Sequence, residues 1–167
     1  DWKVVKIQKI TENEYISLKQ KLSNNYTVYA DKNEIKNARN EKLSELSSTC
    51  KDAITSGVSV LFSDNKFHEF ELTIEDQLNL LTIAADIKNG KTEILYHEKG
   101  KPCQLYSSDD ILLLIQSANN HKTYHTTYYN LLKQYINDLD DIDMIKKISY
   151  GDKLPDNINV SFIDLIK

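Results

Sequence analysis

The sequence predicts an α+β fold in which three main helices pack on a small antiparallel sheet built from two hairpins. Three stretches carry apolar residues at the three- and four-residue spacing that is typical of amphipathic helices. Two pairs of short alternating stretches, each pair joined by a turn sequence, are typical of β-hairpins. A chain of 167 residues is long enough to bury such a core without disulfide bonds. A short N-terminal strand–helix–strand appendage is expected in front of this domain.

The first thirty residues are expected to form this appendage. Residues 3–10 are rich in β-branched side chains, which favours a strand. A capping-box spacing begins at Thr11 and precedes a short amphipathic helix over 12–22. Two asparagines are expected to end this helix, and residues 26–29 to return as a strand.

The core domain is expected to contain three helices with recognisable ends. The first covers residues 31–56, and Gly57 is placed to terminate it. The second opens with a capping-box spacing at Thr73 and closes at Gly90. The third and longest spans about 107–137, and acidic residues near its start complement the helix dipole.

Two hairpins are expected between these helices. Residues 58–62 and 67–72 alternate and flank a polar turn that contains Asn65. Residues 92–97 and 103–106 flank a second turn that contains a glycine. We expect both hairpins to contribute strands to one small sheet.

The predicted elements divide the chain into three parts, an appendage over 1–30, a core domain over 31–137 and a C-terminal extension over 138–167. Apolar residues within 142–148 indicate a short helix or strand in the extension. The segment 160–166 fits a final strand and a final helix equally well.

Composition and charge argue against several classes of protein. Lys and Arg number 21 against 25 Asp and Glu, so the net charge of −4 provides no basic field for nucleic acid or anionic lipid. The longest apolar run has only five residues, over 111–115, far fewer than the roughly 18 that a membrane span needs. Two distant cysteines indicate reduced thiols rather than a disulfide scaffold. We therefore expect neither a nucleic-acid partner nor a membrane.

Four histidines raise the question of a metal site. His121 and His125 are four residues apart and would share one face of a helix. A third ligand would have to come from His68, His97 or Cys103, and no spacing in the sequence requires that. Packing of the two histidines against neighbouring tyrosines is the simpler interpretation, and we expect no metal ligand.

Catalytic and cofactor motifs are equally weak. Cys103 follows a turn and is surrounded by no nucleophile motif, so a buried thiol explains it as well. The acidic run over 138–143 lacks the central glycine and the final glutamate of a calcium-binding loop. No glycine-rich phosphate loop is present. We expect no catalytic residue and no cofactor.

Ten tyrosines are the remaining unusual feature of the composition. Tyr124, Tyr128 and Tyr129 crowd the long third helix, where their rings and hydroxyl groups would suit a protein interface. An equally good interpretation is that they line the edge of the core. In the appendage, Trp2, Tyr15 and Tyr26 are candidate anchors for a partner. For Trp2, the alternative is that it fastens the first strand to the domain.

Several segments in a fixed order carry a family resemblance. They are 38–50, Ile54-Thr55-Ser56-Gly57, 67–79, Tyr96-His97 with Gly100 and Cys103, His125 with 128–133, and Ile148-Ser149-Tyr150-Gly151 before Leu154-Pro155. Over about residues 38–155, roughly 70% of the chain, the sequence resembles a domain of unknown function that recurs in phage tail-module proteins. Genes for this domain often lie near tail-fibre genes.

The resemblance implies a place in a phage, a prophage or a phage-tail-like particle, made in the bacterial cytoplasm and found in the virion. The leading expectation is a non-catalytic structural component or adaptor whose partners are tail, baseplate or tail-fibre proteins. An assembly chaperone for the tail fibre, absent from the finished particle, is the alternative. A metal-dependent or cysteine enzyme built on His97, Cys103, His121 and His125 is the third hypothesis.

Overall fold

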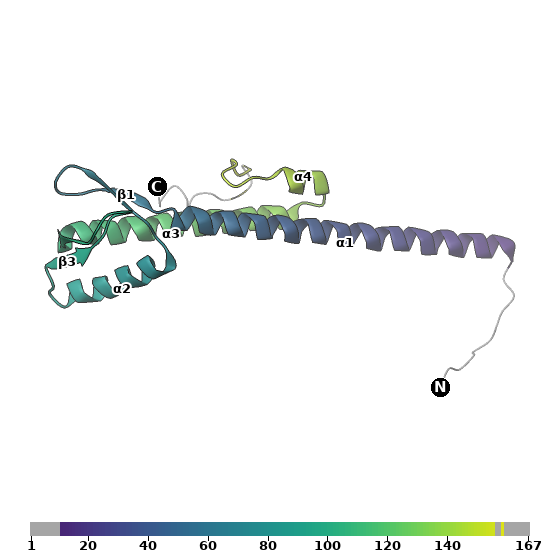
Figure 1. Ribbon diagram of the computed structural model, residues 1–167. Helices are drawn as coiled ribbons and strands as arrows, with labels where there is room; N and C mark the ends of the chain where they lie inside the picture. Colours follow the sequence, from purple (N-terminus) through teal and green to yellow (C-terminus); the bar gives the residue numbers. More distant parts are fainter. Residues whose placement is uncertain (1–10, 156–157, 159–167) are drawn as a thin grey trace, which may run out of the picture.

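The chain folds as an α+β protein of long helices and short antiparallel strands, as the sequence predicts. The computed structural model describes residues 11–155 and Ile158, and over 24–30 it describes the backbone alone. Figure 1 shows one very long helix that leaves a folded end and extends well beyond it. In order, the elements are α1 (Glu12–Thr55), β1 (Val58–Leu61), β2 (Phe67–Phe70), α2 (Ile74–Lys88), β3 (Glu93–Tyr96), β4 (Gln104–Ser107), α3 (Ser108–Asp138) and α4 (Ile142–Lys147).

The predicted strand–helix–strand appendage is wrong for the described residues. Residues 12–30 are helical throughout and continue without a break into the helix expected from Asp31, which gives α1 a length of 44 residues. The capping box at Thr11 does open this helix. Because α1 contains neither Gly nor Pro, the two asparagines and the β-branched residues at 27–28 only weaken the helix and do not end it. The strand predicted over 3–10 lies outside the described residues.

Both predicted hairpins are confirmed, but the single sheet is wrong. Strands β1 and β2 form one two-stranded antiparallel sheet, and β3 and β4 form another. Asn65 lies in the first turn with a φ of +60°, a conformation that asparagine tolerates. The two sheets are joined by a backbone hydrogen bond from Lys99 N–H to the carbonyl of Glu69, at 2.8 Å, and by side chains described below. Each hairpin completes its own ladder, so no strand of one pairs with a strand of the other.

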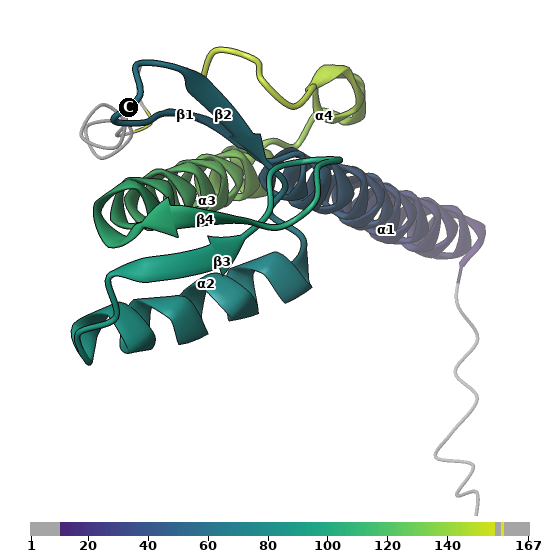
Figure 2. The ribbon, with the colours of Figure 1, turned by 60° about the vertical axis from the view of Figure 1, so that its left-hand side comes forward.

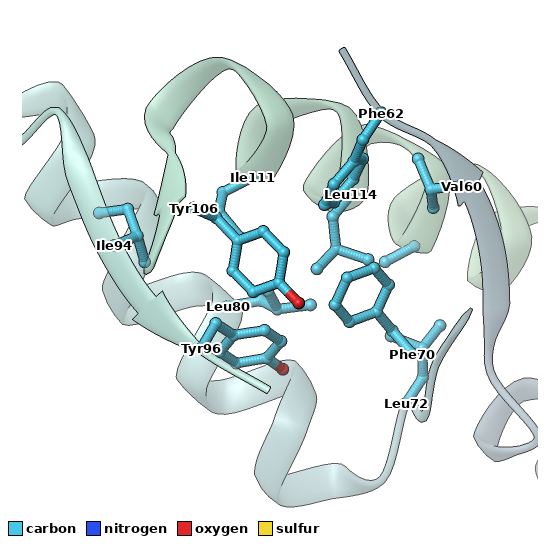
Figure 3. Close-up of a cluster of buried hydrophobic side chains, with 11 residues drawn as sticks. Val60, Phe62, Phe70, Leu72, Leu80, Ile94, Tyr96, Tyr106, Ile111 and Leu114 are labelled. Atoms are coloured by element: carbon cyan, nitrogen blue, oxygen red, sulfur yellow. The ribbon is translucent and has the colours of Figure 1, made fainter. Parts of the chain in front are cut away.

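The first hydrophobic core lies between the two hairpins, α2 and the first half of α3. Figure 3 shows aromatic rings from both hairpins converging on apolar side chains of the two helices. Its buried members are Val60, Phe62, Phe70, Leu72, Leu80, Ile94, Tyr96, Tyr106, Ile111, Leu114 and Ala118. Figure 2 shows β3 and β4 lying beside α2 and α3. The buried residues of the first core pack these strands against the two helices.

A second core joins the second half of α1 to the second half of α3 and to α4. The sequence predicts either a short helix or a strand within 142–148, and the structure has the helix α4 there. The described part of the C-terminal extension is an integral part of this core, because Ile148, Leu154 and Ile158 are buried in it. The segment 160–166, for which helix and strand were both open, lies outside the described residues.

Gly57 is the tightest glycine of the fold, as expected for the end of α1. Its φ is +100°, and a Cβ atom there would lie 1.9 Å from the carbonyl oxygen of Phe70. Gly90 also has a positive φ, of +96°, but a Cβ atom at that position would meet no atom within 4 Å.

These two glycines form a matched pair for measurement. We expect Gly57→Ala to lower the free energy of unfolding by about 4 kcal/mol, because a backbone clash adds to the strained φ. Gly90→Ala should cost only about 1 kcal/mol, which is the conformational penalty alone. Urea unfolding of both variants checks this, and equal losses would show that the Phe70 contact is unimportant.

Candidate protein-binding surface

The N-terminal part of α1 leaves the folded body of the protein. Every described side chain from 11 to 34 is exposed and Ile35 is half-buried. Among the described side chains of α1, Ala38 is the first that is buried. At 1.5 Å per residue, the helix runs about 35 Å from Glu12 to Ile35. We call residues 12–34 the arm and residues 35–155 with Ile158 the head. Figure 1 shows the arm extending away from the head.

The arm carries an apolar seam that nothing in the described chain covers. Tyr15, Leu18 and Leu22 are 55%, 49% and 68% exposed, and Ile16 beside them is 48% exposed. The spacing of three and then four residues places Tyr15, Leu18 and Leu22, which we call the arm seam, on one face of the helix. Isolated helices are only marginally stable in water, and most helices in proteins are stabilised by packing an apolar face. The arm therefore has the properties of a helix that another protein surface covers.

Charged residues flank the arm seam in an ordered way. Glu12 and Glu14 lie near the start of the arm, and Lys19 and Lys21 lie one heptad later. The Glu14 carboxylate accepts hydrogen bonds from the backbone N–H and the hydroxyl of Thr11, at 2.8 and 2.9 Å, and these bonds lower the pKa of Glu14. Among the described ion pairs, none involves Glu12, Lys19 or Lys21. These charges are thus available to a partner.

The three anchor candidates in the appendage have different outcomes. Tyr15 is exposed on the arm seam, where an anchor is expected. Tyr26 lies on the helical backbone of α1, but its side chain is outside the described residues. Trp2 also lies outside them. Leu18 and Leu22 belong to the amphipathic helix predicted over 12–22, but only Tyr15 of this helix was named as a candidate anchor.

The tyrosines of α3 line the edge of the second core. Tyr128 is buried, donates a hydrogen bond to the Asp152 carbonyl at 2.7 Å and accepts one from Gly151 N–H at 3.0 Å. Tyr129 is half-buried and donates to the Leu43 carbonyl at 3.3 Å. Tyr124 is half-buried and stacks on Tyr128. In this structure their contacts are to the chain itself, which matches the core-edge interpretation better than the interface interpretation.

The histidines of α3 also contact the chain itself. His121 Nε2 lies 2.9 Å from the carbonyl oxygen of Ala53, and His125 Nδ1 lies 3.0 Å from the hydroxyl of Tyr150. Burial, aided by the nearby His121, lowers the pKa of His125. Among residues 11–155 and 158, no three His, Cys, Asp or Glu side chains are grouped so that they could hold a metal ion.

The two cysteines lie in different surroundings. Cys50 is buried on α1, and its thiol is 3.4 Å from the His125 carbonyl oxygen. Cys103 is exposed, and no hydrogen bond in the described part of the chain joins it to a histidine. In the described residues, neither thiol forms a hydrogen bond with an imidazole ring, which is the contact that activates a cysteine nucleophile.

A buried carboxylate that the sequence did not reveal joins the two hairpins. The Glu98 side chain is 5% exposed, and one of its oxygens lies 3.0 Å from both His68 Nδ1 and the Tyr106 hydroxyl. Its other oxygen accepts from Lys101 Nζ at 2.7 Å. On the far side of the His68 ring, Nε2 lies 3.2 Å from the Asp64 carboxylate. We call Asp64, His68, Glu98, Lys101 and Tyr106 the polar junction.

Electrostatics within the polar junction favour the charged forms of Glu98 and His68. The hydrogen bond from Lys101, together with those from His68 and Tyr106 and against the effect of burial, lowers the pKa of Glu98 to about 2. Burial disfavours the charged ring of His68, yet the hydrogen bonds with Glu98 and Asp64 raise its pKa above the usual 6.5. Glu98 and Tyr106 of the polar junction are buried, whereas Asp64 and Lys101 are exposed, and the hydrogen bonds of Glu98 connect the two hairpins.

A second apolar surface lies between α2 and α3. Ile74, Leu78 and Leu81 are largely exposed on α2, at a spacing of four and then three residues. They line an open groove of about 320 Å³ together with residues of α3 that include Ile115 and Lys122. The sequence predicts Tyr15 of the arm seam as a candidate anchor, but it predicts neither the complete seam nor this groove.

Comparisons of the chain with protein-family models, with curated proteins and with solved structures find no match. Within the described residues, no helix combines the length and the apolar character needed to cross a membrane.

Proposed function

We propose that this chain is a non-catalytic structural component or adaptor of a phage tail or phage-tail-like particle. In this proposal the head forms the folded body, and the arm docks on another protein of the particle. That protein belongs to the tail, the baseplate or the tail fibre. The phage setting is supported by the sequence resemblance over about residues 38–155 alone, whereas the docking role is supported by the exposed arm.

One observation carries the docking role, and it is the exposed arm seam. Three large apolar side chains at heptad spacing lie on the arm, where every described side chain is exposed. Such a seam fits recognition of a helix by another helix or by a groove, where apolar residues three and four positions apart enter the partner surface. This is a binding function and requires no catalytic group.

A chain that starts at Asp31 separates folding from docking. We expect it to unfold cooperatively with nearly the midpoint of the full chain, because the side chains of 11–23 bury nothing in the head. We also expect it to be lost from purified native particles in which the full chain is present. Thermal unfolding and quantitative mass spectrometry of particles measure the two effects.

The two outcomes of the particle measurement decide between the candidate roles. Near-stoichiometric full chain in finished particles supports the adaptor, whereas its absence from particles, together with capture on fibre protein during assembly, indicates the chaperone. A truncated chain that still enters the particle at the normal level would show that the arm is not the docking element.

A further inference from the structure

The arm seam and its flanking charges together form a self-complementary pattern. In heptad terms, Tyr15 and Leu22 occupy a positions and Leu18 a d position. Glu12 and Lys19 then occupy successive e positions, and Glu14 and Lys21 occupy successive g positions. The e and g positions flank the seam and set the choice and the direction of a partner helix. Each flank of the arm thus carries an acidic residue followed, seven positions later, by a basic one.

We infer that two copies of this chain associate through their arms, side by side and antiparallel, with residue i of one copy opposite residue 33 − i of the other. The inference rests on the proposed function, since it names a second copy of the chain as the protein that covers the arm seam. Tyr15 then faces Leu18 of the second copy, and Leu22 faces Thr11. A twofold axis relates the two copies, so each of these two contacts occurs twice. The same surface of both copies therefore forms the interface, which is isologous.

Charge complementarity selects the antiparallel direction. In an antiparallel pair, e positions face e positions and g positions face g positions, so Glu12 lies near Lys19 of the second copy and Glu14 near Lys21. The twofold symmetry doubles these contacts, so that in the two arms together all eight of these charges at e and g positions are paired with opposite charges. In a parallel pair, Glu14 faces Lys19 of the second copy, but Lys21 faces position 26, which is an uncharged tyrosine, and the partner position of Glu12 precedes the described helix.

The position of the head is compatible with the antiparallel arrangement. Leu22 faces Thr11 of the second copy, and the first residue of the head, Ile35, lies 13 residues further on, about 20 Å along the helix. The head of each copy therefore lies beyond the described start of the other arm. A parallel pair would instead bring the two heads to the same end, side by side.

The size of the seam sets the expected strength of the contact. Two Tyr–Leu layers and two Leu–Thr layers form a small interface, well below the roughly 1,200 Å² of a stable complex. We therefore expect a reversible dimer that forms as the concentration of the chain rises through the high micromolar range and is favoured where copies are held close together.

Charge reversal tests the pairing directly. Sedimentation velocity should show the wild type shifting from monomer to dimer between about 10 μM and 1 mM, in the range typical of weak interfaces. The variant Lys19→Glu/Lys21→Glu and the variant Glu12→Lys/Glu14→Lys should each remain monomeric, because every paired contact becomes repulsive. An equimolar mixture of the two should form a heterodimer that is at least tenfold tighter than either homodimer.

Three results would overturn the inference. A wild type that stays monomeric at 1 mM excludes the dimer, and so do two charge variants that dimerise as the wild type does. A mixture without a heterodimer excludes the charge pairing. Circular dichroism must show equal helix content in all the proteins, because Glu14 also belongs to the cap of α1. Larger assemblies that Leu78→Glu abolishes would instead place the arm in the groove between α2 and α3, which is a head-to-tail contact.

Direction is measured with a spin label on the arm side of the head. Asn37 is exposed on α1, and the label can be attached to Asn37→Cys in a Cys103→Ser background, since Cys50 is buried. In the antiparallel register, the two labels are 41 residues apart along the helix direction, or about 60 Å. A parallel dimer would hold them within about 20 Å, since neighbouring helix axes lie 8–10 Å apart, and a distance in that range would contradict the register.

Failure of this inference and failure of the proposed function give different results. If the wild type shows no self-association at 1 mM but the chain starting at Asp31 is lost from particles, then the arm docks on a different protein and the adaptor role stands. If the arms do dimerise but the truncated chain enters particles normally, the self-association stands and the docking role of the arm is wrong.

Discussion

Glu98→Ala is expected to lower the free energy of unfolding by about 3 kcal/mol, because it leaves buried partners of a carboxylate unsatisfied. In the folded head, this carboxylate accepts from His68, Tyr106 and Lys101. His68 and Tyr106 belong to different hairpins, so that the substitution removes a connection between two separate sheets as well as hydrogen bonds. Lys101 is largely exposed and can turn to water, which limits the loss.

Two further variants show which property of the Glu98 side chain accounts for the loss of stability. Glu98→Gln keeps an oxygen that can accept from Tyr106 but removes the charge, and we expect it to cost about half as much. Glu93→Ala, at an exposed position of β3, should change the stability by less than about 0.5 kcal/mol. Urea unfolding followed by circular dichroism gives all three values. A loss at Glu98 no larger than the loss at Glu93 would show that the polar junction contributes little.

The polar junction also predicts how stability depends on pH. The folded-state pKa of Glu98 is lowered from 4.5 to about 2, so its contribution is present above pH 4.5 and is lost as the pH falls toward 2. The folded-state pKa of His68 is raised, so its contribution is present below its ordinary value of 6.5 and is lost as the pH rises through the folded-state value. Together they are most favourable between about pH 4.5 and 6.5.

The difference in the free energy of unfolding between the wild type and His68→Gln, measured as a function of pH, isolates the contribution of His68. The pKa of His125 is lowered in the folded state, so its effect on the pH dependence of stability has the opposite sign. Because His125 is present in both proteins, its effect cancels in the difference. We expect the stability advantage of the wild type to be largest near pH 5 and to shrink above pH 7. An advantage that grows with pH would contradict the assignment of His68 as the proton-binding member of the polar junction.

Local signals account for the parts of the fold that were predicted correctly. The turn at Asn65, the capping boxes at Thr11 and Thr73 and the glycine at 57 are each decided by a few neighbouring residues, and all are found where expected. Backbone preferences at such positions depend little on the rest of the fold, which is why the sequence reveals them.

The errors concern features that depend on distant residues. Residues 26–29 have side chains that favour a strand, but no strand pairs with them, and the helix that starts at Thr11 continues through them. Glu98 acquires its partners from β2, β4 and its own turn, and no spacing in the sequence brings these together. The arm seam was recognised as an apolar face, and only the structure shows that the head does not cover it.

The double substitution Leu18→Glu/Leu22→Glu is expected to abolish docking without harming the head. It places two charges on the arm seam, where desolvation against a partner would cost several kcal/mol, so we expect at least a 100-fold loss of affinity. Because neither side chain is buried within the chain, the thermal midpoint of the head should stay within about 2 °C of the wild type. Ser17→Glu/Gln20→Glu adds the same charges at exposed positions outside the seam and serves as the matched control.

The most direct test of the adaptor role is the number of copies of each of these three proteins in purified native particles, measured by quantitative mass spectrometry. The proposal predicts a constant, near-stoichiometric number for the wild type and the Ser17→Glu/Gln20→Glu control, and loss of the Leu18→Glu/Leu22→Glu variant from the particle. Equal numbers of all three proteins, or absence of the wild type itself, would contradict it.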